Sequence, residues 1–341
     1  MLAIDFHAHL AREDPGAPPF LRHLFDVEGY AERQADAGVE LTVLSHALID
    51  LQGSASELDE ARAELEFLVE VADRYPGRFA VLAGIDPFGG TRWLEQAQRA
   101  LEAGCAGFCF PTSHAGRYLD SPEAQDALAL ANDQGALVFV HPSESPITAA
   151  RTGDPVLEAW IGLPYDTGIC LSRLLLADTL AGYPELRLVA AHAGGALPMV
   201  LGRLDHVLAS FERRAAMVGG GGPPGGPPRS PGGKGQGGGG RHKGPPADAV
   251  PDAAALQPSL GAPPPSERVG QLYLDTASYH PAAVRAAIAA VGADHVVFGS
   301  DYPPVGESPR PMLDVLAGMG LTPDEEDMIT TANARRLLGL G

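Results

Sequence analysis

The chain has 341 residues, with 43 Asp and Glu against 24 Lys and Arg, and a formal net charge of −19. This charge repels nucleic-acid phosphates and argues against a nucleic-acid partner. No apolar run reaches the roughly 18 residues that cross a bilayer. The N-terminus opens on a strand-like stretch without a basic export signal, so we expect a cytoplasmic protein with no membrane partner. Three cysteines without a C-x-x-C pair indicate neither a disulfide framework nor a thiolate metal site.

Short apolar runs alternate with helical patterns along the chain, which is typical of repeated βα units. The predicted strands are residues 2–7, 39–46, 78–86, 104–110, 136–141, 186–192, 271–276 and 295–301. The clearest helices between them are 56–74 and 196–217, where apolar residues recur at helical spacing. Eight such strands predict an α/β fold, a (β/α)8 TIM barrel formed by residues 1–341 as one domain, with its active site at the carboxyl ends of the strands. A doubly wound open sheet is the alternative, but no G-x-G-x-x-G turn follows the first strand.

A low-complexity segment lies between predicted strands six and seven. Of the 28 residues from 219 to 246, 14 are Gly and 7 are Pro, and the Pro-rich composition continues to about residue 265. Such a segment has too little apolar surface to build a core, so we predict a flexible surface insertion over 219–265. The chain's two lysines, Lys234 and Lys243, both lie in it. Chemistry that depends on lysine is therefore excluded from the barrel.

Polar residues gather where the predicted strands end. His7 and His9 lie at the end of strand one, His141 closes strand five, His192 closes strand six and Asp301 closes strand eight. Alternate residues of an extended segment point to the same side, so His7 and His9 can face one point. Imidazole and carboxylate are the usual ligands of a catalytic divalent metal. The pattern predicts a metal site formed by His7, His9, His141 and Asp301.

Other polar residues near strand ends are interpreted as structural. The histidines assigned to hydrogen-bonded scaffold are His23, His46, His206, His242, His280 and His295. Among them, His46 closes predicted strand two, and a part in the site stays open for it. Asp5 and Asp86 are interpreted as carboxylates that bond to the backbone at the barrel rim.

The motifs resemble the amidohydrolase superfamily of metal-dependent barrels and, more narrowly, its aminocarboxymuconate-semialdehyde decarboxylase subgroup. The resemblance is carried by the H-x-H of strand one, by FVHPSES and HAGGALPMVLGR between residues 139 and 203, and by LYLDTAS and VVFGSDYPP near the C-terminus. It implies that His7, His9, His141 and Asp301 bind one divalent metal, usually zinc and sometimes manganese. It also implies that His192 is the catalytic acid/base.

Arg203 occupies the place of an arginine that, in the family, reaches a substrate carboxylate in the neighbouring subunit. The resemblance therefore implies a homodimer, and the planar fork of arginine suits a carboxylate. The family's decarboxylases carry further arginines soon after strand one. In this chain that region offers Arg12, Arg22 and Arg33 without a clear match.

Three functions are open at this point. The first is non-oxidative decarboxylation of a small unsaturated or aromatic carboxylic acid. The second is a mononuclear amidohydrolase or deaminase, in which Asp301 takes a proton from the attacking water and His192 stabilises the oxyanion. Glu144, three residues after His141, would suit a deaminase. The third is a metal-stabilised barrel without catalysis, which leaves His192 without a role. Dinuclear relatives need a carboxylated lysine at strand four, and its absence here predicts one metal ion per chain.

Overall fold

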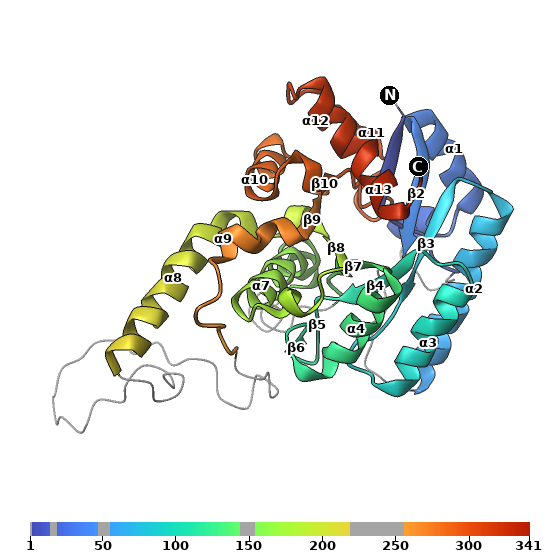
Figure 1. Cartoon of the computed structure of the whole chain (residues 1–341). Helices are drawn as coiled ribbons and strands as arrows, with labels where there is room; N and C mark the ends of the chain where they lie inside the picture. The colour runs from blue at the N-terminus through green and yellow to red at the C-terminus, as the bar shows by residue number, and fades with distance from the viewer. Residues whose placement is uncertain (1, 14–18, 47–54, 144–153, 219–255) are drawn as a thin grey trace.

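The computed structural model describes residues 2–13, 19–46, 55–143, 154–218 and 256–341. Eight parallel strands follow one another around a barrel. They are β1 (Ala3–His9), β2 (Val39–Ser45), β3 (Phe79–Gly84), β4 (Gly107–Pro111), β7 (Leu137–His141), β8 (Arg187–Ala190), β9 (Leu272–Asp275) and β10 (Val296–Val297). The chain after β10 closes the barrel against β1, since Phe6 N donates to Phe298 O at 2.8 Å and His9 N to Tyr302 O at 2.9 Å. The predicted (β/α)8 barrel is confirmed (Figure 1).

Helices cover the outside of the barrel. The longer ones are α1 (Val27–Ala37), α2 (Ala55–Arg74), α3 (Thr91–Glu102), α4 (Gln125–Gln134), α7 (Leu163–Leu176), α8 (Leu197–Val218), α10 (Pro281–Val291) and α11 (Arg310–Ala317). Shorter pieces are α6 (Pro155–Leu157), η3 (Glu158–Gly162), α9 (Pro265–Arg268), α12 (Pro323–Asp327), η9 (Met328–Ala332) and α13 (Asn333–Leu338). Helix α8 extends away from the barrel (Figure 1). The two helices expected at 56–74 and 196–217 are thus present within a residue of their predicted ends.

Two apolar layers hold the barrel together. Inside it, Phe6, Leu82, Phe139 and Val189 belong to one buried cluster, which Leu337 of α13 closes at the amino ends of the strands. A larger cluster lies between the strands and the surrounding helices. Because strand side chains alternate in direction, each strand feeds both layers. Polar side chains at the carboxyl ends of the strands therefore lie above a dry, packed interior.

Several predicted strands end earlier than expected, and for two of them, β8 and β10, a predicted site residue lies beyond the observed end. Strand β8 ends at Ala190 and β10 at Val297. His192 and Asp301 follow in turns, with φ angles of 58° and 52° respectively. Such left-handed backbone is uncommon for residues other than glycine. The chain at both positions therefore bends out of the barrel wall instead of continuing along it.

A short hairpin that the sequence pattern did not predict follows β4. Its strands are β5 (Ser113–His114) and β6 (Arg117–Tyr118). Asp166 on α7 accepts hydrogen bonds from Ser113 Oγ at 2.8 Å and from Tyr118 OH at 2.6 Å, and Thr112 Oγ1 donates to it as well. One buried carboxylate thus joins the β4 loop to the helix that follows β7.

The predicted insertion is described only in part, since its residues 219–255 lie outside the described ranges. From Leu256 onward the chain contacts the barrel's outer helices: Ser259 N donates to Leu176 O and Gly261 N to Glu212 Oε1, both at 2.9 Å. Among the helices within the described ranges, none is long and apolar enough to cross a membrane. The cytoplasmic location stays a prediction.

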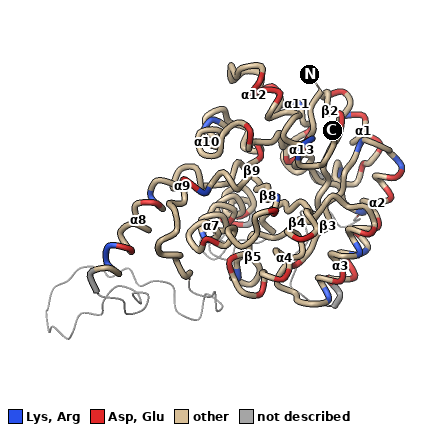
Figure 2. The backbone as a smooth tube through the Cα atoms, viewed as in Figure 1, with Lys and Arg blue, Asp and Glu red and all other residues tan. Residues whose placement is uncertain are grey.

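Acidic and basic residues are interspersed along the outer helices (Figure 2). Two pairs lie one helical turn apart, Glu70 with Arg74 at 2.8 Å and Glu95 with Arg99 at 3.9 Å. Exposed pairs of this kind contribute little to stability. We interpret these surfaces as solvated helix faces.

Candidate metal centre

Five side chains converge at the carboxyl end of the barrel. His7 and His9 come from β1, His141 ends β7, and His192 and Asp301 follow β8 and β10. Asp301 Oδ1 lies 3.4 Å from His7 Nε2 and 3.2 Å from His9 Nε2, and Asp301 Oδ2 lies 3.5 Å from His192 Nε2. The rings of His141 and His7 are centred 4.9 Å apart. Residues from four separate strands therefore meet at one point.

Hydrogen bonds behind the cluster orient both histidines of β1. His7 Nδ1 lies 2.5 Å from Asp275 Oδ2, and His9 Nδ1 lies 3.0 Å from the carbonyl oxygen of Ser45. Both acceptors hold a proton on Nδ1, which leaves Nε2 of each ring to face the centre. The two Nε2 atoms are 3.1 Å apart.

The pKa values of several side chains in the cluster differ strongly from their usual values. Burial lowers the pKa of His9 and of His141, and the neighbouring imidazoles lower that of His141 further. For His7, burial is outweighed by the carboxylates of Asp301 and Asp275, which raise its pKa to about 10. Although burial opposes it, His7 holds the pKa of Asp301 well below its usual range. An ionised carboxylate facing several imidazoles is a donor set suited to a cation.

The residues fit a divalent metal. Ligand atoms of His7, His141, His192 and Asp301 all lie within 4.8 Å of one another. His141 Nε2 is buried and has no hydrogen-bond partner in the described part of the chain. A polar atom left in this way costs free energy unless something binds it. Nitrogen and carboxylate donors around one point are typical ligands of zinc and of manganese.

The structure brings the four predicted ligands together and adds His192 to the same cluster. Arg203 lies elsewhere: it is exposed on α8 and pairs with no residue of the described ranges. His46 turns toward α2, where its Nε2 lies 3.7 Å from Glu64 Oε2. Glu144 lies outside the described residues.

The two rim carboxylates bond to the backbone, as interpreted from the sequence. Asp5 accepts from Ser300 N at 3.0 Å and from Ser300 Oγ at 2.6 Å, while Asp86 accepts from Phe88 N at 2.9 Å. Burial raises the pKa of Asp5 to about 7 despite these bonds. Both carboxylates therefore hold loops in place behind the site.

The arginines after strand one are engaged away from the cluster. Arg12 Nε donates to Glu64 Oε1 at 2.7 Å. Arg33 donates to Asp26 and to the hydroxyl of Tyr302. Arg22 is largely exposed and lies 4.0 Å from Glu307. None of the three thus has an unpaired guanidinium directed at the cluster in the part of the chain that the structure describes.

Two buried polar residues beyond the strand ends or next to the cluster, Asp275 and His114, were not among the residues predicted from the sequence. Asp275, which bonds to His7, ends β9 in the LYLDTAS motif, and a carboxylate one residue before the end of the predicted strand 271–276 was the available signal. His114, in the unpredicted hairpin, is buried with its ring centred 6.4 Å from that of Phe88. It lies three positions after Pro111, the last residue of β4, and no strand-end pattern marks it.

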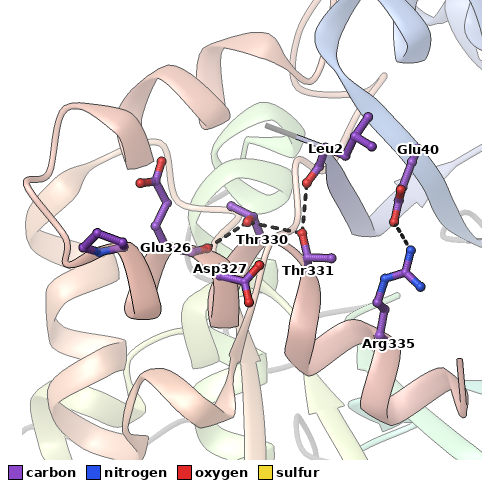
Figure 3. A pocket seen from close by; sticks show the side chains of 8 residues that line it. Leu2, Glu40, Glu326, Asp327, Thr330, Thr331 and Arg335 are labelled. Atoms are coloured by element: carbon purple, nitrogen blue, oxygen red, sulfur yellow. Dashed lines mark hydrogen bonds and ion pairs between the residues drawn. The ribbon is translucent and has the colours of Figure 1, made fainter. Parts of the chain in front are cut away.

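A separate hollow of about 440 Å³ lies at the opposite end of the barrel (Figure 3). Four of its polar side chains have partners in the structure: Arg335 pairs with Glu40 at 2.7 Å, Thr331 Oγ1 donates to Leu2 O at 2.9 Å, and Thr330 Oγ1 donates to Glu326 O at 2.7 Å. Barrel active sites lie at the carboxyl ends of the strands. We therefore assign no reaction to this hollow.

A family model described as amidohydrolase matches residues 4–340, and the chain belongs to this family. The chain is similar to the 2-amino-3-carboxymuconate-6-semialdehyde decarboxylase of Dictyostelium discoideum, with 23% identity over 286 residues that cover 83% of this chain and 67% of that protein. The expected family resemblance is thus confirmed.

Solved structures share the fold over nearly the whole chain. The 5-carboxyvanillate decarboxylase of Sphingomonas paucimobilis superposes with a TM-score of 0.77 at 19% identity, covering 99% of both chains. A dihydroxybenzoic acid decarboxylase of Polaromonas, solved with manganese and an inhibitor, gives a TM-score of 0.72 at 20% identity over 99% of this chain and 97% of that one.

Proposed function

We propose that this protein is a metal-dependent non-oxidative decarboxylase of a small aromatic or unsaturated carboxylic acid. The observation that carries the proposal is the convergence of His7, His9, His141, His192 and Asp301 above an apolar barrel interior. The decarboxylase names of the curated relative and of the two solved neighbours support it.

The proposed ligands of a single ion are His7, His9, His141 and Asp301, with zinc as the ion and manganese as the alternative. An ion held by these residues would act as a Lewis acid toward a substrate carboxylate. The Nδ1 contacts of His7 and His9 orient both rings for this role. The absence of lysine from the barrel supports one ion and not two.

His192 is the proposed proton donor. Loss of carbon dioxide from an sp² carbon leaves an unstabilised carbanion, so that carbon must become tetrahedral first. The imidazolium of His192 gives its proton to this carbon, the bond to the carboxylate then breaks, and its electron pair restores the double bond as carbon dioxide leaves. Solvent returns a proton to His192. Asp301 assists because its Oδ2, 3.5 Å from His192 Nε2, favours a proton on that nitrogen.

We further propose that the protein works as a homodimer in which Arg203 of one protomer reaches the substrate carboxylate of the other. Large apolar side chains are exposed on α8, which carries Arg203, and on the neighbouring η3 and α7: Trp160 is 73% exposed, Tyr165 53% and Met199 80%. Large apolar side chains grouped on a surface are typical of protein interfaces. Helix α7 packs against both η3 and α8, so the elements that carry these residues and Arg203 are neighbours in the structure.

The reaction is tested with the purified protein loaded with zinc or manganese. A panel of aromatic carboxylates and cyclic amides is supplied, and carbon dioxide and ammonia are measured in parallel. We expect carbon dioxide from at least one aromatic acid and no ammonia. Ammonia release from an amide would instead support the hydrolase or deaminase alternative.

The dimer is tested by light scattering and kinetics. Trp160→Asp should shift the protein toward a monomer, and Arg203→Ala should raise KM for the acid without changing the mass. Arg213→Ala, an exposed arginine on the same helix, is the matched control. A monomeric wild-type protein with unaltered KM in Arg203→Ala would contradict the proposal.

A further inference from the structure

We propose that Asp275 is a positioning residue that sets the tautomer of the metal ligand His7 and ties that ligand to the turn bearing His192. The inference rests on the proposed metal site and names a residue that the ligand set does not include. Asp275 ends β9, is fully buried and lies 268 positions from His7 in the sequence.

Each carboxylate oxygen of Asp275 has its own task. Oδ2 lies 2.5 Å from His7 Nδ1. Oδ1 accepts from the backbone N–H of Ala193 at 2.8 Å and from that of Ala277 at 3.0 Å. Ala193 directly follows His192 in the left-handed turn after β8. One side chain therefore contacts both the metal ligand and the backbone that carries the proposed proton donor.

The hydrogen-bond partner of His7 Nδ1 determines which nitrogen of the ring carries the proton. An ionised carboxylate only accepts hydrogen bonds, so the proton at this contact belongs to His7 Nδ1. A proton on Nδ1 leaves the lone pair of the neutral ring on Nε2, which faces Asp301 at 3.4 Å. Partners of this kind orient metal-binding histidines, and their loss typically weakens metal affinity 10–100-fold.

The surrounding backbone is shaped for this contact. A Cβ at Gly299 would lie 2.8 Å from His7 Cβ and 3.0 Å from Asp275 Cβ. Glycine at position 299 thus lets the segment after β10 pass beside both residues. The equivalent contacts of His9 are made by Ser45, whose carbonyl oxygen lies 3.0 Å and whose Oγ lies 3.3 Å from His9 Nδ1. For His7, the contact to Nδ1 is made by the Asp275 side chain, which a substitution can remove.

The experiment compares Asp275→Asn with Asp5→Asn. Asp5 is an equally buried carboxylate two residues from His7, but it bonds to Ser300 and to the backbone N–H of His7 and not to a ligand ring. In Asp275→Asn the amide oxygen can keep the bonds of Ala193 and Ala277. The amide nitrogen then donates to His7 Nδ1 and moves the imidazole proton to Nε2. The Kd for Mn²⁺ should rise by about 10- to 100-fold, and by less than about 3-fold in Asp5→Asn.

A second variant separates the two tasks. Asp275→Ala also removes the acceptor of Ala193 N–H, so turnover at saturating Mn²⁺ should fall in this variant and stay near the wild-type value in Asp275→Asn. Circular dichroism and thermal melting confirm that each variant is folded. An unchanged Kd in folded Asp275→Asn would overturn the inference while leaving the proposed reaction intact. A wild-type chain that binds no Mn²⁺ would overturn both.

A measurement on the wild-type protein tests the same inference without relying on variants that could misfold. In the zinc-loaded wild-type protein, ¹⁵N chemical shifts of the histidines should include a ligand imidazole that is protonated at Nδ1 and hydrogen-bonded to carboxylate. Coordination of His7 through Nδ1 would refute the assignment. Absence of activity with every acid tested would sink the proposed reaction alone, because neither Kd nor the ¹⁵N shifts depend on turnover.

Discussion

His141 and His192 have rings centred only 5.3 Å apart, yet the proposed mechanism gives them different roles. If His141 is one of four ligands, His141→Ala should lose the metal. Structural zinc sites bind with about 10–16 kcal/mol, so one ligand in four is worth roughly 3 kcal/mol. This corresponds to a rise of about 100-fold in the Kd of the metal. His141 Nε2 is buried and has no hydrogen-bond partner in the described ranges. The substitution therefore removes a metal-binding atom without breaking another hydrogen bond of that atom.

His192→Ala should keep the metal and lose turnover. Removal of a general acid or base typically lowers turnover about 10²–10⁴-fold, or about 3–5 kcal/mol of barrier. The metal Kd should change by less than about 3-fold, since the four proposed ligands remain. The structure makes this a severe test, because ligand atoms of His192 and of three proposed ligands lie within 4.8 Å of one another.

The assay starts from protein stripped of metal with a chelator. Metal Kd is measured by competition with a coloured chelator, and turnover is measured as carbon dioxide release at saturating metal. His280→Ala, which removes the side-chain cap of α10, is the histidine control and should change neither quantity. If His192→Ala weakens metal binding as much as His141→Ala, His192 is a ligand and the proposed roles are wrong. If it changes neither binding nor turnover, His192 is scaffold.

Three further outcomes are expected. Burial lowers the pKa of His46 from 6.5 to about 3, so its neutral form stabilises the folded chain above pH 6.5 and this contribution is lost as the pH falls. Between pH 7 and pH 5, the free energy of unfolding should fall by about 2 kcal/mol more in the wild type than in His46→Gln. Urea titrations at several pH values measure this difference. Equal pH profiles of the two proteins would show that His46 does not cause it. Asp166→Ala should lower the free energy of unfolding by about 3 kcal/mol, since three buried hydroxyl groups lose their acceptor at roughly 1 kcal/mol each. A decrease of less than about 1 kcal/mol in the same titrations would refute this prediction. Deletion of residues 219–246 should leave metal content and carbon dioxide release nearly unchanged, because a Gly- and Pro-rich segment adds little buried area; loss of the metal would show that the segment contributes to the site.

The barrel architecture and most of the candidate ligand group could be predicted from the sequence. Strand and helix periodicity are local properties, so the eight βα units could be predicted without any tertiary contact. His7, His9 and His141 lie within strands, where alternation sets the direction of each side chain. The carboxyl ends of parallel strands share one edge of a barrel, which brings these residues together once the barrel is recognised.

The orientation of these side chains depends on contacts between distant parts of the chain and could not be predicted from the sequence. Asp275 meets His7 across 268 positions because β9 and β1 both border the chain after β10, and no local pattern encodes that approach. His192 and Asp301 take left-handed backbone beyond their strands, where strand alternation no longer applies. The partner of a buried polar group depends on which chain segments the closed barrel brings into contact, and periodicity along the sequence does not contain that information.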